Sequence, residues 1–124
     1  MKTDVIEIFQ SIRSVLQPYN VVGFETSMNS ETAYELYTTK GILVNNKKQK
    51  LYFSGVKICK GYVAFYLTAI YINPEIKKLL HPDLMKLLED KSCFHVKMLD
   101  EQLLNHISQA LDVGFIHYKQ QEWV

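Results

Sequence analysis

The chain has 124 residues, with 14 Lys and Arg against 13 Asp and Glu and a net charge of +1 at pH 7. This length builds one domain around a single core, and 48% hydrophobic residues is ordinary for a globular protein. The balanced charge offers no basic face for nucleic acid, and the longest apolar run, "YVAFYLTAIYI", is about half of the ~20 residues that span a membrane. We therefore expect one domain over residues 1–124 that binds neither nucleic acid nor membrane.

The first residues predict where the protein resides. The stretch "MKTDVIEIFQ" carries acidic residues and has no continuous apolar segment of the kind found in a secretory signal peptide. We therefore expect a cytoplasmic protein, in which Cys59 and Cys93 stay reduced.

Residues 5–16 have the spacing of an amphipathic helix. Asp4 is placed to cap its first turn, with Glu7 three residues later, and Pro18 ends it. The predicted buried face consists of Val5, Ile8, Phe9, Ile12, Val15 and Leu16.

From Val21 onward apolar residues recur at every second position instead of at helical spacing, which predicts β-strands. The predicted strands cover residues 21–27, 32–40, 50–59 and 62–72. A turn at "MNSE" separates the first two, a longer loop containing Gly41 and Asn45–Asn46 follows, and Lys60–Gly61 predicts a tight turn between the last two. The last strand is apolar on both faces, which is typical of a central strand covered on both sides.

The C-terminal part mixes short helical turns, one strand and a long helix. Pro74 and Pro82 each stand at a predicted first helical position, "SCFHVKM" is a short strand, and Asp100 caps the final helix. The predicted buried face of that helix consists of Leu103, Leu104, Ile107, Leu111, Phe115 and Tyr118. The whole pattern predicts a two-layer α+β fold, with an antiparallel sheet of about five strands flanked by N- and C-terminal helices.

Cys93 and His95 stand two residues apart on a predicted strand, so their side chains share one face. They could hold a metal with ligands from elsewhere, or His95 could deprotonate Cys93 for nucleophilic attack. However, one C-x-H lacks the paired spacing of a zinc site, and Cys93 follows a helix C-terminus, where the dipole does not favour a thiolate. Our interpretation is that Cys93 packs into the core and that His95 lies at a sheet edge.

The other histidines do not predict a metal site. His106 and His117 share a face of the last helix but lie about 16 Å apart, and His81 begins a helical turn. The sequence contains no phosphate-binding loop, dinucleotide fingerprint, nucleophile elbow or zincin motif. Any cofactor or metal therefore stays unassigned.

Tyrosine is unusually frequent in the predicted strands. The six residues concerned are Tyr34, Tyr37, Tyr52, Tyr62, Tyr66 and Tyr71. A sheet face lined by tyrosine combines an apolar wall with a few hydroxyl groups, which is typical of a small-ligand pocket. The alternatives are an aromatic core or a dimer face.

Four stretches resemble the YdhG-like family, a bacterial family of unknown function. They are "YELYTTKG" (34–41), "LYFSGVKICKGYVAFYLTAIY" (51–71), "DKSCFHVK" (90–97) and "GFIHYKQQEWV" (114–124). The chain departs from the family pattern at Ala69, where many members have proline, and at His95, where many have asparagine. The resemblance implies a compact α+β domain with an antiparallel sheet and flanking helices. One branch is described as frataxin-like, which implies weak iron binding on an acidic ridge and an iron-chaperone role.

Together these observations predict a small-ligand-binding module rather than an enzyme. The predicted ligand-binding residues are Tyr37, Phe53, Tyr66, Tyr71 and Cys93. Two alternatives stay open: a frataxin-like iron chaperone, and an enzyme that depends on Cys93. A homodimer formed through the aromatic sheet face or the final helix is also a possible assembly.

Overall fold

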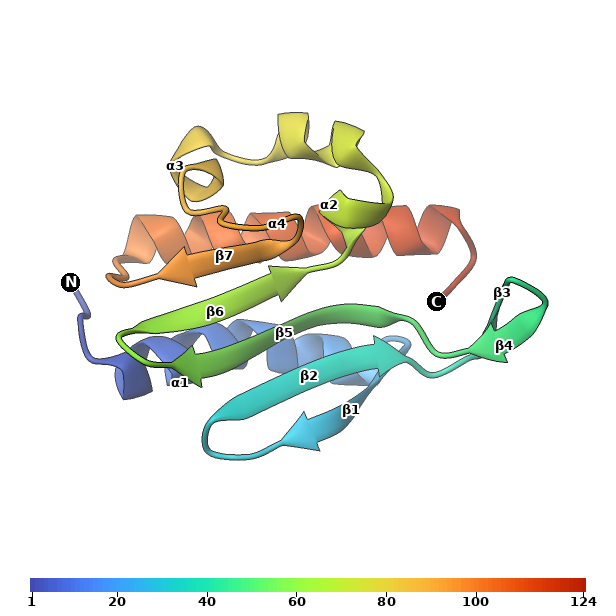
Figure 1. Cartoon of the computed structure of the whole chain (residues 1–124), viewed down its shortest axis with the longest axis horizontal. Coiled ribbons are helices and arrows are strands. Elements are labelled where there is room, and N and C mark those ends of the chain that lie inside the picture. Colours follow the sequence, from blue (N-terminus) through green and yellow to red (C-terminus); the bar gives the residue numbers. More distant parts are fainter.

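The computed structural model describes residues 1–124 as two layers, in which an antiparallel sheet carries two long helices on one face (Figure 1). The five strands follow the order β1-β2-β5-β6-β7 across the sheet. They are β1 (Phe24–Asn29), β2 (Ala33–Thr38), β5 (Tyr52–Cys59), β6 (Tyr62–Leu67) and β7 (Cys93–Val96). The helices are α1 (Val5–Leu16) and α4 (Glu101–Gln120), which pack on the sheet and on each other. The predicted α+β fold class is confirmed.

Both long helices begin at the predicted caps. The Asp4 carboxylate accepts a hydrogen bond from the Ile6 amide at 2.9 Å, and the Asp100 carboxylate accepts one from the Leu103 amide at 2.8 Å. These bonds satisfy amide groups that the first turn of a helix leaves without a partner. After α1 the chain continues as the 3-10 turn η1 (Gln17–Val21), with Pro18 near its start, so the predicted end of the helix is confirmed.

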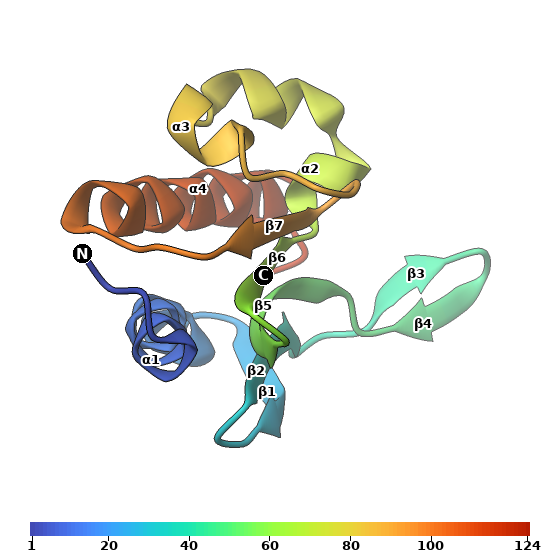
Figure 2. The same cartoon turned by 60° about the vertical axis from the view of Figure 1, so that its left-hand side comes forward.

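The structure contains one hairpin turn that was predicted and one that was not. Lys60–Gly61 joins β5 to β6 as predicted, and Gly61 has a φ of +84° that suits glycine. The predicted loop around Asn45–Asn46 is instead a hairpin of β3 (Ile42–Val44) and β4 (Lys47–Gln49). Both asparagines have positive φ, which gives a two-residue turn with the twist that a hairpin needs. This small hairpin projects from the body of the domain (Figure 2).

The predicted strand over residues 62–72 is too long. Strand β6 ends at Leu67, and the chain then forms the short helix α2 (Ala69–Ile72). The turn η2 (Pro74–Leu79) and the short helix α3 (Pro82–Met85) follow, each beginning at its predicted proline. No helix in the structure combines the length and the apolar character needed to cross a membrane.

The sheet is covered on one face only, so the prediction that β6 is covered on both sides was wrong. Val63, Phe65 and Leu67 point to the face that α1 and α4 cover, and all three are fully buried. Tyr62 and Tyr66 point to the other face and stay partly exposed. Figures 1 and 2 show both long helices on the same side of the sheet.

A β-bulge decides where Phe53 lies. Leu36 pairs with Ser54 while Tyr37 pairs with Tyr52, so Phe53 is an extra residue in β5. Its ring turns toward the helices, where it stacks on Phe24 at a centroid distance of 4.1 Å and is fully buried. Phe53 is therefore part of a core of 24 buried residues between the sheet and its helices.

Candidate functional site: the tyrosine face

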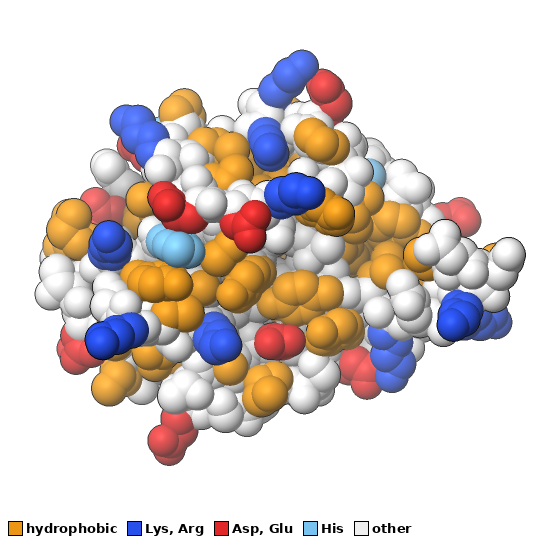
Figure 3. All heavy atoms as spheres, in the orientation of Figure 1, with side chains coloured by type: hydrophobic (Ala, Val, Ile, Leu, Met, Phe, Trp, Pro, Cys, Tyr) orange, Lys and Arg blue, Asp and Glu red, His pale blue; other side chains and the backbone are white.

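The uncovered face of the sheet carries four tyrosines. We call it the tyrosine face and define it by Tyr37, Tyr52, Tyr62 and Tyr66, which lie on β2, β5 and β6. In Figure 3, which shows the molecule from this side, side chains of the hydrophobic class form a band across the sheet with a few charged groups among them. An aromatic surface of this kind is left open because no helix crosses it.

Three of these rings form a row. The ring centroids of Tyr37 and Tyr52 are 5.1 Å apart, and those of Tyr52 and Tyr66 are 6.3 Å apart. Gly55 makes the row possible, because a β-carbon at this position would overlap the Tyr52 hydroxyl. The bulge in β5 turns Tyr52 to this face, and the glycine leaves the space that its ring fills.

Cys93 continues the row on the neighbouring strand. It pairs with Tyr66 across β6 and β7, and Tyr66 in turn pairs with Gly55. Burial raises the pKa of the Tyr66 hydroxyl to about 12, and the neighbouring Cys93 adds to this shift. Burial also raises the pKa of Tyr37, with a further contribution from the Glu35 carboxylate. At neutral pH these hydroxyls are therefore protonated and can both donate and accept hydrogen bonds.

A second aromatic pair lies farther along β6. The Tyr62 ring stacks on the His95 ring with a centroid distance of 4.1 Å and an interplanar angle of 22°. Ala64 lies between the Tyr62 and Tyr66 positions on this face and pairs with Lys57 on one side and His95 on the other. With Glu35, which pairs with Gly55, the face thus combines flat rings with one cation, one carboxylate and one imidazole.

The structure brings three of the five predicted ligand-binding residues together. Tyr37, Tyr66 and Cys93 all point to the tyrosine face. Phe53 does not, because the bulge turns it into the core, so its assignment to the site was wrong. Tyr71 lies in α2, beyond the end of β6; it is 57% exposed, and its ring faces the Lys91 ammonium at 5.4 Å.

Cys93 does not face the core, so that part of our interpretation was wrong. Side chains alternate between the two faces of a strand. Phe94 and Val96 lie in the core, so Cys93 and His95 share the opposite face, which is the tyrosine face. Cys93 is nevertheless only 7% exposed. The position of His95 on an edge strand is confirmed, since β7 is the last strand of the sheet.

The environment of Cys93 predicts a poorly reactive thiol. Burial raises its pKa, the Asp90 and Glu89 carboxylates add to this effect, and the Tyr66 hydroxyl partly offsets it. A raised pKa lowers the thiolate fraction at neutral pH, so we expect iodoacetamide to alkylate the less buried Cys59 first. Mass spectrometry of peptides from the native protein, sampled over time, measures both rates. Faster alkylation of Cys93 than of Cys59 would contradict this description of the site.

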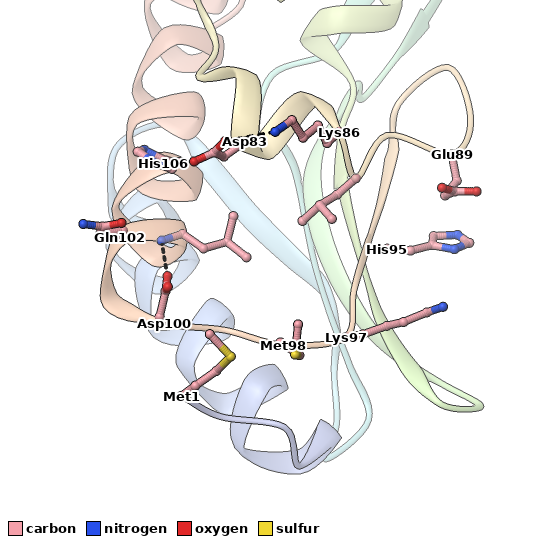
Figure 4. A pocket seen from close by; sticks show the side chains of 12 residues that line it. Met1, Asp83, Lys86, Glu89, His95, Lys97, Met98, Asp100, Gln102 and His106 are labelled. Carbon is pink, nitrogen blue, oxygen red and sulfur yellow. Dashed lines mark hydrogen bonds and ion pairs between the residues drawn. The ribbon is translucent and has the colours of Figure 1, made fainter.

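The main cavities of the protein do not lie on the tyrosine face. The most prominent has a volume of about 480 Å³ and is formed by β7, α3, the start of α4 and the N-terminus (Figure 4). None of the four main cavities is lined by Tyr37, Tyr66, Tyr71 or Cys93. A ligand on the tyrosine face would therefore lie along the sheet rather than inside an enclosed cavity.

A group of potential metal ligands beside this cavity was not predicted from the sequence. His81, Asp83 and His106 each offer a ligand atom, and these atoms all lie within 4.8 Å of one another. The only local signal is that His81 and Asp83 stand two residues apart. His106 is 25 positions farther on than His81 and reaches the group only because α3 packs against α4.

No family model, curated protein or solved structure matches this chain. The resemblance to the YdhG-like family therefore stays a prediction.

Proposed function

We propose that this protein is a small-ligand-binding module that takes a flat organic ligand on the tyrosine face. The observation that carries the proposal is the row of rings in which Tyr52 lies between Tyr37 and Tyr66, on a sheet face that no helix covers. Tyrosine rings bury much apolar area against a flat partner, while their hydroxyls keep hydrogen-bonding capacity at the ring edge. The proposed role is binding rather than catalysis.

The chemistry of the face narrows the ligand class. The rings favour a ligand with a flat apolar surface, such as a heteroaromatic ring or the apolar side of a sugar. The protonated hydroxyls favour hydroxyl, amide or carbonyl groups at the ligand edge. Glu35 and Lys57, which occupy the same face, can pair with charged substituents. We therefore propose a polar ligand with one flat side and a mass typical of a metabolite.

The experiment is a thermal unfolding screen with a metabolite library, because a ligand that binds only the native state raises the midpoint. We expect a stabilising compound whose affinity is roughly tenfold weaker for Tyr66→Ala, which loses one aromatic contact of about 1–1.5 kcal/mol. Leu43→Ala is the matched control, since Leu43 is 66% exposed on the separate β3–β4 hairpin.

Other outcomes of the screen would contradict the proposal. A shift produced only by ferrous iron under anaerobic conditions, and lost when surface carboxylates are changed to amides, would favour the iron-chaperone alternative. If no compound acts and Tyr66→Ala converts a dimer to a monomer in sedimentation, the occupant of the face is a second copy of the chain.

A further inference from the structure

Three side chains meet where α3 packs against α4. His81 immediately precedes α3, Asp83 lies within it, and His106 lies in the second turn of α4. We call these residues the histidine cluster; their ligand atoms all lie within 4.8 Å of one another. None of the three is on the tyrosine face, so this cluster is independent of the proposed function.

The three side chains lie almost close enough to bind one metal ion. In the structure their positions are fixed by ring stacking, a hydrogen bond and ion pairs. The His81 and His106 rings stack with a centroid distance of 3.7 Å and an interplanar angle of 10°. The His81 Nδ1 atom accepts a hydrogen bond from the Asp83 amide at 3.0 Å and lies 3.8 Å from the Asp83 carboxylate. On the other side of that carboxylate, the Lys86 ammonium lies at 3.6 Å.

We propose that the histidine cluster binds one divalent cation of the zinc type. Two imidazoles and one carboxylate form a donor set that suits Zn²⁺, with metal–ligand distances of about 2.0–2.2 Å. Ligand atoms on one tetrahedral ion then lie about 3.3–3.5 Å apart. The 3.8 Å separation between His81 Nδ1 and Asp83 must therefore close by a few tenths of an ångström, and the distances to His106, which are within 4.8 Å, by at most about 1.5 Å.

The required movement is confined to side chains. A metal lies in the plane of each imidazole that binds it, so the two stacked rings must tilt toward one another at their nitrogen edges. The His81 and Asp83 side chains are 40% and 61% exposed, which leaves them room to rotate. Binding at Nδ1 uses the lone pair that now accepts the Asp83 amide, so the cation replaces this helix cap.

The cavity gives the cation an open coordination position. Asp83 and His106 both line the cavity of about 480 Å³, and Figure 4 shows them side by side on one wall, with Glu89, His95 and Lys97 on the other side. Three protein ligands leave the fourth position of a tetrahedral zinc site for water or a small molecule. Here that position would face the cavity, whose other charged lining residues are Lys86, Lys97, Glu89 and Asp100.

Calorimetric titration of the tag-free, chelator-treated chain with zinc sulfate tests the proposal. We expect one equivalent to bind wild type. His106→Ala and Asp83→Asn should each weaken binding by more than the roughly 10–100-fold typical of residues that merely support a metal ligand. His95→Ala is the matched control, because His95 lines the same cavity but lies outside the cluster, and it should bind zinc as wild type does.

A second measurement separates coordination from a folding defect. His81→Asn keeps a side-chain acceptor for the Asp83 amide while removing the imidazole, so α3 should stay capped and zinc binding should be lost. In an amide NMR spectrum of wild type, zinc should shift the Asp83 signal strongly. The proposal is overturned if wild type binds no zinc, or if His106→Ala and His81→Asn, shown to be folded by circular dichroism, bind it as tightly as wild type.

Discussion

Replacing Phe53 with alanine is expected to lower the free energy of unfolding by about 3–5 kcal/mol, the range for deleting a buried aromatic ring. Phe53 is fully buried, stacks on Phe24 at 4.1 Å and meets Tyr118 edge-on at 5.2 Å. Its neighbour on the helix side is Gly114, where an added β-carbon would lie 3.5 Å from the Phe53 ring. A glycine has no side chain with which to fill the cavity, so little relaxation can offset the loss.

Urea denaturation followed by circular dichroism measures this effect, with Leu43→Ala as the control. Leu43 is largely exposed, so its truncation should change the free energy of unfolding by no more than about 0.5 kcal/mol. A loss below about 1 kcal/mol for Phe53→Ala would contradict the placement of this ring in the core. It would also reopen the assignment of Phe53 to a ligand site.

Gly55→Ala is expected to have the second-largest effect, because the new methyl group would occupy the place of the Tyr52 hydroxyl. It would also lie 3.1 Å from the Tyr34 carbonyl oxygen, which belongs to the neighbouring strand and cannot move freely. The Tyr52 ring must therefore leave its position between Tyr37 and Tyr66. We expect a loss of about 1–3 kcal/mol in the free energy of unfolding, as for other overpacked sites, together with loss of ligand binding on the tyrosine face.

Gly41→Ala is the matched control for this substitution. Its β-carbon would meet its nearest neighbour, Lys48, at an ordinary contact distance of 3.4 Å, and its φ is not positive. Both variants restrict the unfolded chain in the same way, so the difference between them isolates the clash with Tyr52. Equal stability of the two variants, with an unchanged near-ultraviolet circular dichroism spectrum of the tyrosines, would show that Tyr52 does not lie over Gly55.

The parts of the fold that depend on local interactions could be predicted from the sequence. The Asp4 and Asp100 caps, the turn at Lys60–Gly61 and the faces of the two long helices all depend on residues a few positions apart. The end of β6 could not be predicted in this way. After Leu67 and Thr68 the residues of α2 are all apolar, and periodicity does not distinguish a four-residue helix from the end of a strand.

The errors over Phe53 and Cys93 have one cause, which is that pairing across the sheet is not visible along the chain. In a regular strand Phe53, three positions before the buried Val56, would lie on the opposite, tyrosine face. The bulge against β2 turns it to the core instead. Cys93 was expected in the core, yet it lies on the tyrosine face, where its partner across the sheet is Tyr66. The histidine cluster depends on the packing of α3 against α4, which no spacing in the sequence reveals.

The measurement that most directly tests the central claim is amide NMR mapping of a compound that stabilises the wild-type protein. We expect the shifted signals to come from β2, β5, β6 and β7 around Tyr37, Tyr52, Tyr66 and Cys93, and to vanish at the same compound concentration in Tyr66→Ala. Shifts confined to α3, α4 and the cavity beside β7, with the sheet signals unchanged, would contradict the assignment of the ligand site to the tyrosine face.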